Sequence, residues 1–309
     1  MSLVAWKQPY LLQVMVDDEP ENPRGEEDNI GHMVCWHRRY HLGDEHQYEK
    51  PNDFLKELVQ RTVSGDAILD YVQSGKSDAV RLMEGGLKQI AGEPAKDHVV
   101  SGLRVEGYDR YAKEWYEEDF FSGGLREQRK EIVDCLVDLM ADKDLLALAR
   151  KENILLPLYL YDHSGLSMSV SDFVGHAVHA EWDSGQVGWI YATSGDIRAV
   201  YGGVSPENME RAEWCLQSEV KRYDYYLSGQ CYGVRLYENG EETESIWGFL
   251  GNLSDVLKEI VDYILPEDYQ DMVELFQEVP DIKTCSMGYG DIMGELGYPE
   301  PFAGAGMEV

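Results

Sequence analysis

The 309-residue chain lacks long hydrophobic runs. It contains no stretch of about 18 apolar residues, so the sequence predicts no membrane-spanning helix. Residues 1–20 contain one lysine and a short apolar run, without a small-residue cleavage site. This pattern favours a strand over a signal peptide. We therefore expect no membrane partner and a cytoplasmic protein.

Cysteine is scarce and scattered. The five cysteines lie at positions 35, 135, 215, 231 and 285, and none has C-x-x-C spacing. Isolated cysteines in odd number are typical of free thiols in a reducing compartment. The sequence also lacks the H-E-x-x-H, G-x-S-x-G and G-x-x-x-x-G-K-[ST] motifs of zinc peptidases, serine hydrolases and P-loop proteins. From these absences we expect no cofactor.

Basic residues are also few. Fifty-eight acids against 27 bases give a formal net charge of −31. Residues 17–29 carry seven acids and one arginine, and residues 238–281 carry thirteen acids and one lysine. A field of this sign repels nucleic acids and anionic membranes and attracts basic proteins and cations. The charge therefore predicts no direct binding to nucleic acid.

Three interpretations fit this charge. In the first, the carboxylates confer solubility on an ordinary globular protein. In the second, they adapt the protein to high salt. In the third, they imitate DNA, because a net charge of −31 is about the charge of 15 base pairs. The third interpretation predicts contact with a partner through segments 17–29, 106–120 and 238–281. The predicted contact residues are Asp17, Asp18, Glu19, Glu26, Glu27, Asp28, Glu117, Glu118, Asp119, Glu241, Glu242 and Glu244.

Hydrophobic periodicity predicts an α+β fold with a helix-rich N-terminal half. A strand is predicted at residues 10–16, and helices at about 66–73, 77–90 and 125–150. The C-terminal half is predicted to hold a mixed or antiparallel sheet with packed helices. Its elements are strands at 153–163 and 186–194, a helix from Ser205-Pro206 to about Leu227, and a hairpin at 231–250 around Asn239-Gly240. The predicted regions are residues 1–150, 151–283 and an irregular tail at 284–309.

Asp162, His163 and Ser164 are the residue types of a hydrolytic triad. Neighbouring side chains on a strand point to opposite faces, so adjacency prevents the three from meeting as a triad. A turn is the simpler interpretation of "DHSG" after an apolar strand, and of "WDSGQVG" at 182–188. The alternative is a metal-assisted hydrolase that uses Asp162, His163 and Asp183. Its candidate metal ligands are His163, His176 and His179, and a second group of histidines (32, 37, 41 and 46) lies near Cys35.

Three segments resemble a family of proteins encoded by phages, prophages and mobile elements of bacteria. They are "LPLYLYDHSG", "WDSGQVGWIY" and "MVCWHRRYHLGDE", and the resemblance spans roughly residues 10–250. The most specific element is "WDSGQVG". The resemblance implies an accessory protein that acts in the cytoplasm of an infected bacterial host, and it supplies no catalytic residues.

Charge and resemblance together favour a noncatalytic anti-defence protein. Its expected partner is a basic, DNA-binding bacterial defence complex, such as a restriction enzyme or a Gabija-like nuclease. Carboxylates would face the lysine and arginine side chains that otherwise contact phosphate. The metal-assisted hydrolase stays the alternative, a structural phage protein is a third reading, and self-association is left open.

Overall fold

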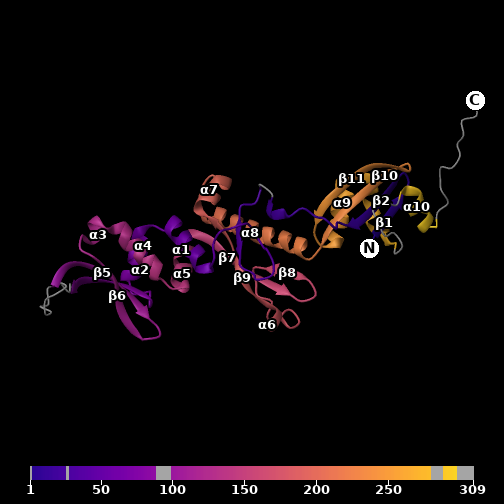
Figure 1. Cartoon of the computed structure of the whole chain (residues 1–309). Coiled ribbons are helices and arrows are strands. Elements are labelled where there is room, and N and C mark those ends of the chain that lie inside the picture. Colours follow the sequence, from indigo (N-terminus) through magenta and orange to yellow (C-terminus); the bar gives the residue numbers. More distant parts are fainter. Residues whose placement is uncertain (1, 26–27, 88–98, 280–287, 298–309) are drawn as a thin grey trace, which may run out of the picture. The chain divides into compact units, whose positions relative to one another are not determined.

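The computed structural model describes residues 2–25, 28–87, 99–279 and 288–297. Its strands form sheets of five, four and three strands (Figure 1). The chain divides into two compact units, each built from segments far apart in sequence. Unit 1 comprises Met1–Asn29, Leu158–Gln186 and Gln217–Val309, and unit 2 comprises Ile30–Pro157 and Val187–Leu216.

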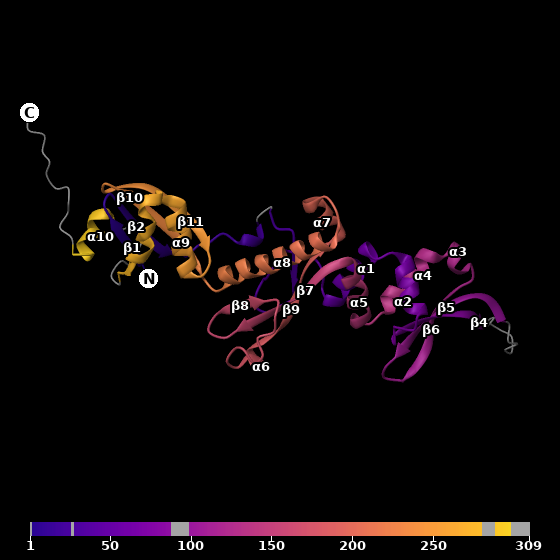
Figure 2. The same ribbon diagram turned by 180° about the vertical axis from the view of Figure 1, so that it is seen from behind.

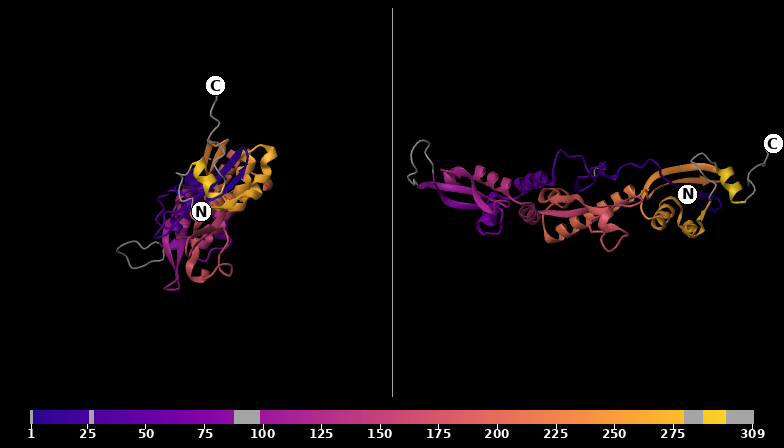
Figure 3. Two further views of the ribbon diagram at one scale, coloured as in Figure 1. Left: turned by 90° about the vertical axis from the view of Figure 1, so that its right-hand side faces the viewer. Right: turned by 60° about the horizontal axis from the view of Figure 1, so that its bottom comes forward.

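The five-stranded sheet belongs to unit 1, and its strands pair antiparallel. Helical segments α9 (Leu253–Ile264) and η2 (Glu267–Leu275) lie on one side of it, as the right-hand view of Figure 3 shows. Leu12 and Val14 of the sheet are buried there with Ile260 and Met272. In order across the sheet, the strands are β11 (Glu241–Leu250), β10 (Cys231–Glu238), β2 (Tyr10–Val16), β1 (Ser2–Lys7) and β12 (Gln277–Glu278).

The other face of this sheet packs against α10 (Tyr289–Glu295), where Leu11 is buried with Ile292 and Met293. Asn239 and Gly240, with φ of +53° and +91°, join β10 to β11. These are the left-handed conformations that a two-residue hairpin turn needs. The predicted hairpin is therefore confirmed.

The four-stranded sheet has the order β3-β9-β7-β8. Its strands β7 and β9, and the long helix α8, each contain residues of both units. Asn208 N–H donates to Ser205 Oγ at 3.2 Å, so α8 starts at the predicted cap. The strands of this sheet are β3 (His32–Cys35), β7 (Asn153–Asp162), β8 (Leu166–Ser169) and β9 (Ser184–Thr193). The helical segments not yet described are η1 (Pro23–Gly25), α6 (Ala180–Asp183), α7 (Ser194–Tyr201) and α8 (Pro206–Leu227).

Unit 2 packs helices against the three-stranded sheet (Figure 2). Its core joins Phe54 and Leu58 with Leu136 and Leu148 from the helices, and Val105 from the sheet. The helices are α1 (Pro51–Thr62), α2 (Gly65–Gln73), α3 (Gly124–Glu127), α4 (Arg129–Leu139) and α5 (Asp142–Glu152). The strands, in order, are β4 (Val80–Leu87), β5 (Val99–Asp109) and β6 (Glu114–Phe121).

The predicted fold class is wrong, because the N-terminal half is not helix-rich. Strands β1 to β6 lie before Asn153, and strands recur along the whole described chain. The predicted helix at residues 77–90 is wrong, because this segment contains strand β4. Val80 and Leu82 of β4 pack on the core, and Gly85 has a φ of +76°, which does not fit a right-handed helix. Residues 106–120, rich in aromatics and acids, lie in the β5–β6 hairpin. The predicted helix at 125–150 is interrupted at Met140, whose backbone is extended.

The predicted boundaries at residues 150 and 283 stay predictions. The predicted tail at 284–309 lies mostly outside the described residues, which include α10. No helix in the described part of the chain combines the length and the apolar character needed to cross a bilayer.

Candidate acidic interface

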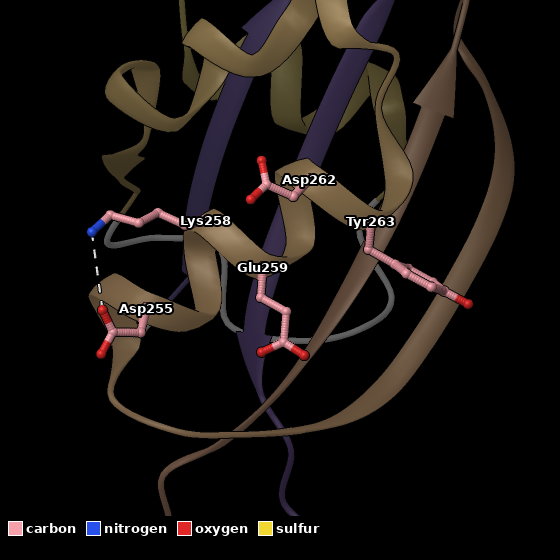
Figure 4. Close-up of a pocket in the computed structure, with 5 residues that line it drawn as sticks. All are labelled: Asp255, Lys258, Glu259, Asp262 and Tyr263. Atoms are coloured by element: carbon pink, nitrogen blue, oxygen red, sulfur yellow. Dashed lines mark ion pairs between the residues drawn. The ribbon is translucent and has the colours of Figure 1, made fainter.

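An open hollow of about 540 Å³ lies on the solvent face of α9. Its lining residues are Asp255, Lys258, Glu259, Asp262 and Tyr263, and all five come from α9 (Figure 4). The opposite face of the helix is anchored in the core by Val256, Ile260 and Val261. The amphipathic pattern therefore fixes which side chains reach solvent. We call this feature the α9 hollow.

Carboxylates dominate the α9 hollow. Asp255, Glu259 and Asp262 are spaced by four and three residues, which places them on one helix face. Lys258 Nζ lies 4.0 Å from Asp255 Oδ1, and both side chains are well exposed, so this ion pair contributes little. Among the described residues, Glu259 and Asp262 have no hydrogen-bond or ion-pair partner.

The α9 hollow suits a guanidinium or ammonium group. Carboxylates form charge-assisted hydrogen bonds with such groups, and a tyrosine ring attracts cations to its face. Tyr263 is 73% exposed, so its ring is accessible to a partner. The hollow thus offers charge and apolar surface together.

Strand β11 carries three of the predicted contact residues at the edge of the five-stranded sheet. Glu241, Glu242 and Glu244 are all exposed. Arg235 Nη2 lies 2.5 Å from Glu242 Oε2, so this carboxylate is already paired. Glu241 and Glu244 have no such partner among the residues described. Charges on an edge strand also block pairing with another sheet, a role that requires no partner protein.

Strand β6 carries three more predicted contacts, on the edge of the three-stranded sheet in unit 2. Glu117, Glu118 and Asp119 are exposed. A register shift between Val105 and Glu106 opposes two β5 residues with these three residues of β6. The Asp119 carboxylate accepts the Phe120 N–H at 2.8 Å. The structure therefore brings predicted acidic contacts to both units.

The predicted contacts in residues 17–29 differ among themselves. Asp18, Glu19 and Asp28 are exposed, whereas Asp17 is half-buried and accepts the Glu19 N–H at 3.1 Å. Burial, with the Asp17 carboxylate beside it, raises the pKa of the Cys231 thiol to about 11. The Asp17 carboxylate is therefore already engaged within the fold. The remaining two predicted contacts, Glu26 and Glu27, lie outside the described residues.

The segment "DHSG" forms the turn between β7 and β8. Ser164 has a φ of +61°, and the His163 N–H donates to the Gly165 carbonyl at 3.2 Å. Asp162 lies at the end of β7, in register with Leu166. The turn predicted at "DHSG" is confirmed. The turn predicted at "WDSGQVG" is wrong, because α6 ends at Asp183 and β9 starts at Ser184.

Tertiary structure does bring His163 to Asp183. His163 Nδ1 and Asp183 Oδ2 are 2.8 Å apart, and both side chains are more than a third exposed to solvent. The His179 ring lies 5.8 Å from the His163 ring, while the exposed His176 has no side-chain partner among the described residues. No group of three or more His, Cys, Asp or Glu side chains in the described ranges is arranged to hold a metal ion.

Similarity to known proteins assigns no role to these surfaces. Comparisons with protein-family models, curated proteins and solved structures found no match. The resemblance to proteins of phages and mobile elements stays a prediction. Geometry and charge are therefore the basis for a functional proposal.

Sequence reasoning selected the segment 238–281 but missed the individual acids of the α9 hollow. These acids are spaced by four and three residues and lie on the helix face opposite to Val256 and Ile260. This spacing indicates an acidic helix face and could have been recognised in the sequence. It also missed the pairing of His32 with Asp196, whose Nε2 and Oδ2 atoms are 3.5 Å apart. These two residues are far apart in sequence, so no local spacing reveals them.

Asp196 helps to start α7. Its carboxylate accepts the N–H and the hydroxyl of Thr193 at 2.8 and 2.7 Å. Burial alone would raise the pKa of Asp196, but hydrogen bonds from His32 and Thr193 outweigh it and lower this pKa to about 2. The hydrogen bond to Asp196 raises the pKa of His32 in return.

Proposed function

We propose that this chain is a noncatalytic acidic protein that binds a positively charged protein, with the α9 hollow as its central contact. The supporting observation is that Glu259 and Asp262 are unpaired beside an exposed Tyr263. Lysine or arginine side chains of a partner would replace water around these carboxylates. The tyrosine ring would supply the desolvated anchor that interfaces favour.

The partner class proposed is a bacterial defence complex with a basic, DNA-binding groove, in the cytoplasm of a phage-infected host. This class rests on the net charge of −31 and on the resemblance to proteins of phages and mobile elements. Such a groove presents lysine and arginine at spacings that suit phosphates. Complementary fields would accelerate encounter, and this acceleration would decline with salt.

The test is retention of host proteins on the immobilised chain, compared between two variants of equal net charge. Asp255→Asn, Glu259→Gln and Asp262→Asn together remove the charge of the α9 hollow. Asp70→Asn, Glu131→Gln and Glu207→Gln remove three exposed acids elsewhere. We expect a basic protein that binds the native chain and the control at low salt, elutes at about 0.5 M salt, and binds the α9 variant at least about tenfold more weakly.

Equal retention by the two variants would refute the α9 hollow as the contact. Retention that ignores salt would refute an electrostatic interface altogether. Circular dichroism and thermal melting of each variant separate lost binding from lost fold.

A second candidate function is hydrolysis with His163 as general base. The 2.8 Å contact between His163 Nδ1 and Asp183 favours it, because a carboxylate at Nδ1 leaves Nε2 free to accept a proton. Hydrolysis of p-nitrophenyl acetate and p-nitrophenyl phosphate tests this candidate. Activity that is lost in His163→Ala would support it, and absence of turnover by the native chain would reject it for ester substrates of this kind.

A further inference from the structure

Unit 2 carries a depression beside the turn that joins β5 to β6. Two adjoining hollows of about 490 and 530 Å³ share Tyr108 and Arg110 as lining residues. One reaches Lys113 and Trp115, and the other reaches Lys143 at the start of α5. We call the pair the turn hollow. Volumes of this size lie within the range of small-molecule sites, about 300–1,000 Å³.

The turn hollow has a local charge opposite to that of the chain. Three cations, Arg110, Lys113 and Lys143, line it with two carboxylates, Asp78 and Asp142. Lys143 Nζ is 2.5 Å from Asp78 Oδ2, so these two charges form an ion pair with each other. The Asp142 carboxylate accepts a hydrogen bond from Asn52 Nδ2 at 2.6 Å.

Two of these cations are left for a ligand. Within the described residues, Arg110 and Lys113 donate no side-chain hydrogen bond and form no ion pair, although Arg110 lies within electrostatic range of Asp78. Lysine and arginine are the scarce charged residues of this chain, 27 against 58 acids. Two unpaired cations at one hollow therefore stand out from an acidic surface.

Aromatic rings form a wall of the turn hollow. The centroids of Tyr108 and Trp115 are 5.2 Å apart, with their planes inclined at 58°. The Arg81 guanidinium lies 4.2 Å from the centroid of the Trp115 ring. Arg81 is held by the buried Glu106, which also pairs with Arg104 at 2.6 Å. The buried carboxylate thereby positions Trp115 before any ligand arrives, which lowers the entropic cost of binding.

The turn that carries the cations is also held in place. Asp109 Oδ1 accepts the N–H groups of Tyr111 and Ala112 at 2.8 and 3.0 Å. The Tyr108 N–H donates to the Ala79 carbonyl at 2.9 Å, which joins this end of β5 to the start of β4. Arg110 and Lys113 therefore extend from a defined backbone.

We propose that the turn hollow binds a small anion that carries a planar ring, of the class of nucleoside monophosphates. The phosphate would receive charge-assisted hydrogen bonds from Arg110 and Lys113. The ring would pack against Tyr108 and Trp115. A polyanion is disfavoured by the field of a chain with net charge −31, whereas a small ligand carries little charge into that field. This site shares no residue with the α9 hollow and does not depend on the proposed function.

Calorimetric titration with adenosine 5′-monophosphate (AMP), adenosine and inorganic phosphate tests the proposal. We expect AMP to bind at least about tenfold more tightly than either adenosine or phosphate, because only AMP engages both walls. Arg110→Ala with Lys113→Ala should weaken AMP at least about tenfold and leave adenosine unchanged. Trp115→Leu should weaken AMP and adenosine alike.

The matched control is Arg126→Ala with Lys130→Ala, which removes two exposed cations elsewhere in unit 2. It should bind AMP as the native chain does. The proposal is overturned if AMP fails to bind at about 1 mM, if it binds no more tightly than inorganic phosphate, or if the turn variant and the control lose equal affinity. Thermal melting of each variant verifies that the fold is retained.

Discussion

The α9 hollow and the turn hollow have opposite charge within one chain of net charge −31. The first has three carboxylates and one lysine, and the second has three cations and two carboxylates. At physiological salt, charges influence each other over about 8 Å, so a local group can reverse the sign set by the whole chain. Net charge therefore guides which macromolecules approach, while the local lining decides which group binds.

The two hollows also differ in how they are built. The α9 hollow comes from one helix, so its lining follows from spacing along twelve residues. The turn hollow gathers residues from three separate parts of the chain, which only the pairing of β4 with β5 and the packing of α4 against the sheet bring together. They are residues 78, 79, 108, 110, 113, 115, 139, 141, 142 and 143. Long-range contacts thus matter more for the cationic site.

The strongest test of this contrast is Glu106→Gln. This substitution removes a buried carboxylate and leaves Arg81 and Arg104 without their partner. We expect the free energy of unfolding to fall by about 1–3 kcal/mol. The loss is smaller than for a fully buried ion pair because both arginines are partly exposed. Release of Arg81 should also weaken AMP binding, because Trp115 loses its support. Urea unfolding and calorimetry measure the two effects.

Glu84→Gln is the control for this substitution, since Glu84 is exposed on β4 of the same sheet. It should change the free energy of unfolding by less than about 0.5 kcal/mol. Equal effects of the two substitutions would show that the Glu106 cluster does not support the turn hollow.

Removing the three carboxylates of the α9 hollow should separate the two sites. We expect the Asp255→Asn, Glu259→Gln, Asp262→Asn variant to bind a fluorescent deca-arginine peptide about tenfold more weakly, or ~1.4 kcal/mol, while AMP affinity stays unchanged. Fluorescence anisotropy and calorimetry give the two affinities. A similar loss in the control with Asp70, Glu131 and Glu207 neutralised would mean that the peptide senses only total charge.

Asn252→Ala should loosen the helix beneath the α9 hollow. The Asn252 side chain caps α9 by accepting the Ser254 N–H at 3.0 Å, and loss of such a cap costs about 1 kcal/mol. Urea unfolding monitored by circular dichroism measures the loss. Asn252→Ser should restore most of it, because serine is an equally good cap, and an Ala variant as stable as the native chain would contradict the capping role.

The smallest expected effect is the change in stability with pH that comes from the His32–Asp196 pair. Asp196 has its pKa lowered to about 2, so its stabilisation is complete above about pH 4 and is lost as the pH falls from about 4 towards 2. His32 has a raised pKa, so its contribution is present at low pH and disappears as the pH rises through that value. Asp196→Asn should remove the acid-side loss and lower the pKa of His32.

An NMR titration of the His32 ring measures this change. Asp183→Asn, next to His163, serves as the control and should leave the pKa of His32 unaltered. An unchanged His32 pKa in Asp196→Asn would contradict the pairing of His32 with Asp196.

Local chemistry explains which predictions succeeded. The Asn239-Gly240 turn and the Ser205 cap of α8 depend on neighbours within a few residues, so their sequences specify them. The helix prediction for residues 77–90 was wrong because the spacing of apolar residues there fits a helix, whereas the segment pairs with β5 as strand β4. Tertiary pairing overrides a weak local preference of this kind.

The sequence by itself determined the acidic character of the chain, its hairpin and helix signals, and the acidic face of α9. Each follows from composition or from periodicity within one element. Only the tertiary structure decided that Arg110 and Lys113 stand unpaired beside Tyr108 and Trp115, and that His32 meets Asp196. The reason is physical: a side chain's partners across a sheet depend on which strands pair, and that choice is made by burial of the whole core rather than by nearby residues.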